Sequence, residues 1–370
     1  MFIISFIFFY CISYLLFSNL SKKLHVSEVI FNVFYLVKFI YILYFIYFNI
    51  TDPFATDTKA HFYNNFKFDS DTFIIGDNLV YGINLFFSEI LLFNFTTVNL
   101  FTIFPSFLST LLLLSIISEI DNGKKKIILY LILIIPSINF WTIGMNKDMF
   151  SHLSLSIFLY GIYKKNFFLI TLSLIITFFI RPYLTFVILI SLLVILFFKI
   201  IFQFKSNFTI KNIFLIFMSI SVVYFVLLFL LGPFGVQFID GEIPKIIKNL
   251  QSHYTNSRLG IPVDQIYVLR LFNYLFYPLP WSDQTTEFAL LIIMFENFLI
   301  LFVFIYLFIS SKSFMNKNYL YFFGLMSFTL LLIMLSLITS NYGIAFRQKW
   351  MIIPFLLILL SINFKKKTNF

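Results

Sequence analysis

The chain has 370 residues and contains four arginines, whose side chains suit them to hold an anionic group. A guanidinium donates two parallel hydrogen bonds to a phosphate or carboxylate, whereas an ammonium acts as a point charge. The arginines are Arg181, Arg258, Arg270 and Arg347. Lys349 follows Arg347 closely, and Lys147 lies in another short polar turn. We predict that this basic set binds the phosphate of a lipid such as a polyprenyl phosphate. Salt bridges to carboxylates or to lipid phosphates are the alternative for each arginine.

A second candidate group is Asp57 with His61 and Tyr63 in the segment TDTKAHFYNN. A carboxylate at a membrane surface can take the proton of an acceptor hydroxyl, and a nearby histidine can share that proton. Glycosyl transfer needs such a base when the donor sugar leaves on a phosphate. The alternative is an ordinary solvated loop, and it contains further acids, namely Asp52, Asp69, Asp71 and Asp77.

Two aromatic motifs complete the candidate chemistry. In the segment WTIGMNKD, Lys147 and Asp148 form either a simple ion pair or a unit in which Lys147 neutralises a phosphate and Asp148 orients the sugar. In the segment YPLPW, Trp281 either anchors a helix at the membrane surface or stacks on a sugar face.

Long apolar segments must position these residues. The chain is 61% hydrophobic and 11% charged, with a mean hydropathy of +0.97. Runs of about 18 or more apolar residues are long enough to cross ~30 Å of hydrocarbon. We predict an all-α, polytopic membrane protein with about eleven spans, between ten and twelve. They are 2–18, 29–50, 97–118, 127–143, 149–163, 167–180, 183–201, 213–233, 288–310, 319–339 and 350–363.

These spans are predicted to form a single transmembrane domain, 1–370, with two large outer loops, 51–96 and 234–287. The segment 81–96 is apolar but is interrupted by polar residues, so we predict an interfacial or re-entrant helix there. If it spans the bilayer instead, every later loop changes sides.

The charge distribution predicts the orientation. One set of loops holds 15 basic and three acidic residues, and the opposite set holds ten basic and 12 acidic residues. Lysine-rich loops remain in the cytoplasm, so the N-terminus lies outside and the C-terminus inside a bacterial cytoplasmic (inner) membrane. All four arginines then face outward. The net charge of +10 is explained by topology, and no nucleic-acid partner is expected.

Several classes of site are disfavoured. The single cysteine, Cys11, excludes an internal disulfide, and the four histidines lack metal-ligand spacing. We expect no cofactor, although a divalent metal stays open. The predicted cytoplasmic loops are too short for a nucleotide-binding domain. Lys38 and Glu296 lie within predicted spans. One interpretation is that they form an ion pair between two helices.

The order of these motifs resembles that of bacterial envelope-polysaccharide proteins, namely GT-C-like glycosyltransferases and Wzy-type O-antigen polymerases. The matching residues are Asp57, His61, Tyr63, Trp141, Gly144, Lys147, Asp148, Arg181, Pro182, Pro278, Pro280, Trp281, Arg347, Lys349 and Pro354. The resemblance implies a GT-C-like fold and the transfer of sugar from a polyprenyl (undecaprenyl) phosphate to a lipid-linked glycan acceptor. Asp57 has no acidic neighbour at the next position, unlike many GT-C enzymes, which weakens the case for a metal-dependent mechanism.

We therefore predict a membrane glycosyltransferase of O-antigen or capsule synthesis, with single-sugar transfer and repeat-unit polymerisation both open. The predicted catalytic residues are Asp57, His61 and Arg347. The predicted phosphate-binding residues are Lys147, Arg181, Arg258, Arg270 and Lys349, and the predicted sugar contacts are Tyr63, Asp148 and Trp281. The alternatives are a lipid-linked oligosaccharide flippase or other transporter, and a structural protein of the envelope. The concentration of polar residues in outer loops favours surface chemistry over a transport path.

Overall fold

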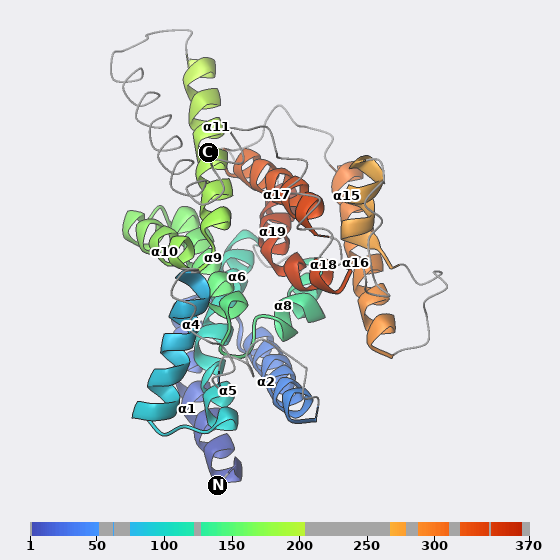
Figure 1. The fold of residues 1–370 in the computed structure, drawn as a ribbon. Helices are drawn as coiled ribbons and strands as arrows, with labels where there is room; N and C mark the ends of the chain where they lie inside the picture. Colours follow the sequence, from blue (N-terminus) through green and yellow to red (C-terminus); the bar gives the residue numbers. More distant parts are fainter. Residues whose placement is uncertain are drawn as a thin grey trace. The chain divides into compact units, whose positions relative to one another are not determined.

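The structure, a computed structural model, describes residues 2–51, 62, 75–121, 127–203, 267–278, 288–310, 319–339 and 342–364. All secondary structure within these ranges is helical (Figure 1), which confirms the predicted all-α class. The chain forms two compact units, which we describe separately: unit 1, Met1–Arg181 with Phe364–Phe370, and unit 2, Pro182–Asn363. The number of spans and the GT-C-like fold stay predictions.

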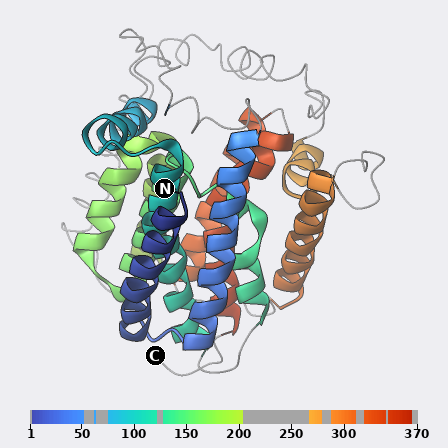
Figure 2. The same ribbon diagram turned by 90° about the horizontal axis from the view of Figure 1, so that it is seen from below.

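Unit 1 begins with two long helices, α1 (Phe2–Lys23) and α2 (Glu28–Thr51), which lie side by side (Figure 2). Its other helices follow in chain order: α4 (Ile75–Leu85), a π-helical turn (Phe86–Ile90), α5 (Phe95–Phe101), α6 (Ile103–Asp121), α7 (Ile127–Ile134), α8 (Pro136–Phe140), α9 (Lys147–Lys164) and α10 (Phe167–Ile180). Helix α9 packs against both α6 and α10, and more than half of its residues are buried.

Helix α2 shows why this fold belongs in a membrane. Between Val33 and Ile50, its exposed side chains are all apolar or aromatic, among them Leu36, Ile40 and Tyr47. The polar side chains Lys38 and Asn49 of the same stretch are instead fully buried. A helix at a water-facing surface shows the opposite pattern. The helices α1 and α2 and the stretch Phe95–Glu119 are each long and apolar enough to cross a bilayer.

The predicted span 127–143 is broken. Helix α7 ends at Ile134, because Pro136 disfavours helical geometry in the residue before it and has no backbone N–H. The short helix α8 follows, and residues 141–146 are not helical. Helix α9 then begins after Asn146, whose side chain accepts a hydrogen bond from the Met149 N–H at 2.9 Å.

The segment 81–96 also differs from its predicted boundaries. The helix that contains its first part begins earlier, at Ile75, and the π-helical turn ends at Ile90. Asn94 is an N-cap rather than an interruption: its Oδ1 accepts a hydrogen bond from the Thr97 N–H at 2.8 Å and starts α5. Whether this segment lies at the interface stays a prediction.

Unit 2 contains α11 (Pro182–Gln203), α15 (Tyr267–Phe276), α16 (Phe288–Ser310), α17 (Tyr319–Ile338), α18 (Tyr342–Gln348), a 3₁₀ turn (Lys349–Met351) and α19 (Ile353–Phe364). Helix α15 packs against α16, α17 and α18. Helix α16 repeats the pattern of α2, since Phe295, Phe298 and Phe302 are exposed while Glu296 and Asn297 are buried. The predicted span 213–233 lies outside the described residues.

The last predicted span, 350–363, is the second half of a broken segment. Residues Gly343–Met351 and Ile353–Leu360 form two helical pieces bent by 48°. Pro354 explains the restart, because it cannot donate a hydrogen bond to the preceding turn and is tolerated only near a helix start. Arg347 and Lys349 therefore lie in a helix and a 3₁₀ turn, whereas the sequence predicted an outer loop around them.

Candidate functional site

The structure brings together Asp148 and Arg181, which belong to two different predicted motifs. Asp148 is buried in the first turn of α9, and Arg181 follows the last residue of α10. The Arg181 guanidinium donates a hydrogen bond to Asp148 Oδ1, and the two side chains form an ion pair. The sequence suggested Lys147 as a partner of Asp148 and gave no sign of Arg181, which lies 33 residues away.

The packing of α9 against α10 places these two residues at the same end of the helix pair. Ser154 and Thr177 share a hydrogen bond of 2.8 Å between the helices. The Arg181 backbone N–H donates to the Thr177 carbonyl at 2.7 Å and completes the last turn of α10. Pro182 then starts a new helix, so the Arg181 side chain is fixed at the boundary between them.

The residues Trp141–Asn146 form a buried, non-helical segment just before α9, which we call the linker segment. Gly144 has a φ of 82°, a conformation that favours glycine. Its N–H donates to Thr102 Oγ1 at 3.4 Å, and the carbonyl of Met145 accepts a hydrogen bond from Asn84 Nδ2 at 3.3 Å. Helices α4, α5 and α9 thus enclose the segment.

An apolar cluster ties the linker segment to the first predicted outer loop. Met145 and Met149 pack with Phe87 and Val98, and Phe62 lies against this cluster. The Phe62 and Phe95 ring centroids are 5.4 Å apart. Phe62 is the one described residue between positions 52 and 74, and in the sequence it lies between two predicted site residues.

Lys38 of α2 also contacts the linker segment. It is the eleventh of the 24 residues of α2 and is fully buried. Its Nζ lies 3.0 Å from Thr142 Oγ1, 3.4 Å from Asn139 Oδ1 and 3.5 Å from the carbonyl oxygen of Ile138. All three are neutral oxygens. The sequence showed that Lys38 lies inside a span but gave no sign of these contacts.

A buried serine–histidine contact lies between α6 and α9. Ser109 Oγ is 2.8 Å from His152 Nδ1, and Ser109 also donates to the carbonyl of Ser106 at 2.7 Å. His152 follows Asp148 by one helical turn and interacts electrostatically with Lys38. In the sequence, His152 is one of four scattered histidines, and no local pattern points to Ser109.

In unit 2, Arg270 binds the end of a helix. It is buried on α15, and its Nε donates to the carbonyl of Ser336 at 2.7 Å and its guanidinium NH₂ to that of Thr339 at 3.1 Å. These carbonyls end α17, where a cation is favourable. This predicted phosphate-binding residue therefore has at least one structural role.

Lys349 lies deep in unit 2 rather than at its edge. It is buried and donates a hydrogen bond to Asn297 Oδ1, and Asn297 is the tenth of the 23 residues of α16. Lys349 also interacts electrostatically with Glu296. The neighbouring Gln348 accepts hydrogen bonds from Thr339 at 2.8 Å and from Tyr274 at 3.3 Å. Arg347 is partly buried on α18.

The remaining predicted site residues lie outside the described residues. They are Asp57, His61, Tyr63, Arg258 and Trp281. Their assigned roles stay predictions, as does the expectation that no cofactor is bound.

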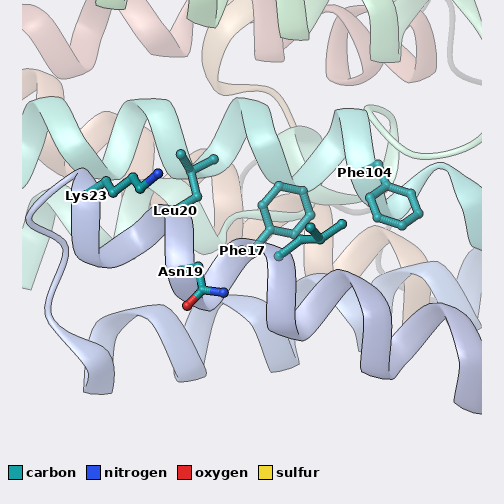
Figure 3. Close-up of a pocket in the computed structure, with 6 residues that line it drawn as sticks. Phe17, Asn19, Leu20, Lys23 and Phe104 are labelled. Atoms are coloured by element: carbon teal, nitrogen blue, oxygen red, sulfur yellow. The ribbon is translucent and has the colours of Figure 1, made fainter.

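A surface pocket lies away from these groups. Figure 3 shows it between the C-terminal part of α1 and the start of α6, with Phe17, Lys23 and Phe104 among its lining residues. Its walls are mainly apolar, and none of the candidate site residues lines it.

Comparison with known proteins found no matching family model, no similar curated protein and no similar solved structure.

Proposed function

We propose that the chain is a membrane glycosyltransferase that uses polyprenyl-linked sugar donors at the outer face of a bacterial cytoplasmic membrane. The acceptor is a lipid-linked glycan, and the product is a cell-surface polysaccharide such as O-antigen or capsule. Repeat-unit polymerisation is one form of this activity. The proposal rests on the motif order in the sequence together with the distribution of buried charge.

The observation that carries the proposal is an excess of basic over acidic side chains, buried or nearly so, among apolar helices. The described part of unit 1 contains two such bases, Lys38 and Arg181, and one such acid, Asp148. The described part of unit 2 likewise contains two such bases, Arg270 and Lys349, and one such acid, Glu296. Cationic side chains are costly within a bilayer and typically mark the path of a charged substrate. A polyprenyl phosphate offers a negative charge on an apolar chain, which suits such an interior.

The proposed division of labour follows from chemistry. Lys147 and Arg181 bind the donor phosphate and stabilise the charge that develops on it as the sugar leaves. Asp57, assisted by His61, takes the proton of the acceptor hydroxyl. The contact of Phe62 with the cluster around Met145 and Met149 supports this pairing of motifs, because it ties the first predicted loop to the segment before α9.

A flippase for lipid-linked oligosaccharides is the second candidate, and one observation favours it. Both units contain a broken helical segment with a buried lysine beside it, Lys38 in one and Lys349 in the other. Discontinuous helices near the midplane are typical of transporters. A transferase and a flippase differ in one measurable respect, since only a transferase forms a new glycosidic bond.

The test is an assay of sealed membrane vesicles from a strain that lacks the protein, with and without the restored gene. The vesicles receive a labelled polyprenyl-linked sugar donor and a lipid-linked acceptor on the predicted outer face. We expect a glycosylated product only when the wild-type gene is present, and loss of that product with Asp57→Asn and with Arg347→Lys.

The control is Lys22→Met, which alters an exposed lysine at the end of α1. Immunoblots verify equal membrane levels for all variants. Movement of the donor between leaflets without a new product selects the flippase. Full product with both Asp57→Asn and Arg347→Lys removes the proposed catalytic roles.

A further inference from the structure

Lys38 differs from the other buried bases in what surrounds it. Arg181 is paired with a carboxylate, and Lys349 interacts with one. Arg270 holds the end of α17 through a bond as short as 2.7 Å. Within the described ranges, the hydrogen-bond partners of Lys38 are three neutral oxygens of α8 and the turn after it.

Two of the three hydrogen bonds of the Lys38 ammonium are also long. Hydrogen bonds from a nitrogen donor to an oxygen normally measure about 2.7–3.2 Å. The Thr142 hydroxyl, at 3.0 Å, lies within this range, but the other two oxygens, at 3.4 and 3.5 Å, lie beyond it. A lysine that served only to cap α8 would be expected to form shorter bonds to the helix carbonyls. The ammonium therefore has capacity for a better acceptor.

Two asparagines of α4 and α5, which are connected to the linker segment by hydrogen bonds, offer further unused hydrogen-bonding capacity. Asn84 donates to the carbonyl of Met145, so its amide faces this segment, and its Oδ1 is buried without a hydrogen-bond partner among the described residues. Asn99 Oδ1 is also buried without a hydrogen-bond partner among the described residues. The Asn99 carbonyl accepts from Thr102, whose hydroxyl in turn accepts from the Gly144 N–H. Buried amide oxygens of this kind require donors such as water or hydroxyl groups.

We propose that the linker segment and Lys38 form a binding site in unit 1 for a phosphate-linked sugar, with Lys38 binding the phosphate and the Asn84 and Asn99 amide oxygens accepting from hydroxyl groups. This site deepens the proposed function and rests on it, because it assigns the donor phosphate to a residue on α2. The chemistry combines one anionic group with polyol hydroxyls. Non-helical backbone at membrane depth occurs where it is buried or lines a cavity, which agrees with this role.

The test measures binding to purified full-length protein in detergent micelles. The probes are polyprenyl phosphate, the uncharged polyprenol of equal length, phosphatidylglycerol and inorganic phosphate. Wild type should bind polyprenyl phosphate at least about tenfold more tightly than polyprenol, the effect of one charge-assisted hydrogen bond. Lys38→Met and Lys38→Gln should lower this ratio clearly below that of wild type, since only Lys147 and Arg181 then remain to bind the phosphate, and Lys38→Arg should lower it less. Lys22→Met is the control and should leave the ratio unchanged.

The outcomes separate the inference from the proposed function. If wild type does not prefer polyprenyl phosphate to polyprenol, the proposed donor and this site both fail. If wild type prefers it and the folded Lys38→Gln protein does so equally, only this site is refuted. Displacement by phosphatidylglycerol at equal concentration would identify the ligand as a general lipid headgroup, and displacement by inorganic phosphate as a free anion; either result overturns the sugar-phosphate assignment.

A second measurement uses wild-type protein, in case the Lys38 variants do not fold. A polyprenyl phosphate sugar that carries a photoreactive group on the sugar should label peptides containing residues 138–146 or the facing part of α4. Unlabelled donor should suppress the labelling, and unlabelled polyprenol should not. Labelling confined to unit 2 would overturn the proposal.

Discussion

Lys164 and Glu119 form an ion pair between the C-terminal ends of α9 and α6, at the end of α9 opposite to Asp148. Both residues belong to loops that the charge distribution assigns to the cytoplasm. Asp148 and Arg181 belong to turns assigned to the outside, and they also lie together. In unit 1, each of these ion pairs therefore joins residues from loops that the charge distribution assigns to the same side of the membrane.

This grouping predicts the outcome of cysteine labelling with a membrane-impermeant maleimide in a Cys11→Ser background. Thr51→Cys, at the exposed C-terminal end of α2, should react in intact cells. Lys165→Cys, in the exposed turn after α9, should react only after the membrane is opened. The reverse pattern would place the arginines in the cytoplasm and remove the basis of the proposed chemistry.

The ion pair between Asp148 and Arg181 should couple the two residues strongly. Their side chains are only 1% and 12% exposed, and removal of one partner from a buried pair typically costs about 3–5 kcal/mol. Asp148→Asn and Arg181→Gln should therefore each lower the thermal stability of the purified protein markedly. The double variant should lose much less than the sum of the two single losses. Additive losses in this double-mutant cycle would show that the pair contributes little.

Gly161 should be intolerant of any side chain. A Cβ atom at this position would lie 3.1 Å from both the backbone N and the Cγ1 of Ile170, so α10 would have to move away from α9. We expect Gly161→Ala to cost about 1–3 kcal/mol, as overpacking does in other cores. Gly82→Ala on α4 is the matched control, because a Cβ there meets nothing within 4 Å. It should leave stability unchanged or raise it by up to about 1 kcal/mol. Equal thermal shifts for the two variants would contradict the packing argument.

Arg270 allows a structural role to be separated from a binding role. Lysine cannot reproduce its two bonds to the carbonyls of Ser336 and Thr339. If these bonds are its main contribution, Arg270→Lys should lower stability by about 1–3 kcal/mol with little change in donor affinity once the protein is folded. Reduced donor affinity at unchanged thermal stability would instead support the phosphate-binding role predicted from the sequence.

The sequence predicted much of the helical framework but not the breaks within it. Apolar runs such as 167–180 coincide with a helix because they contain no proline or glycine that would interrupt it. The break at Pro136 was missed because the run around it is predominantly apolar, and Pro354 was read as part of a span for the same reason.

The candidate site shows the same limit. Asp148 and Arg181 were predicted as site residues from two separate motifs, but their contact depends on the packing of α9 against α10, which hydropathy does not encode. Lys38 was noticed only as a charge inside a span. Its three oxygen contacts arise from the break between α7 and α8, 100 residues away in the chain, so no local spacing could reveal them.

The bend between α18 and α19 has a consequence for biogenesis. At 1.5 Å per residue, the 12 residues of α19 extend about 18 Å, well short of the ~30 Å of bilayer hydrocarbon, and the seven residues of α18 extend less. We therefore expect that neither piece inserts into a bilayer by itself. Asn297 of α16, Tyr274 of α15 and Thr339, which follows α17, provide polar partners for Lys349 and Gln348. Insertion of this end of the chain should then depend on earlier assembly of these helices.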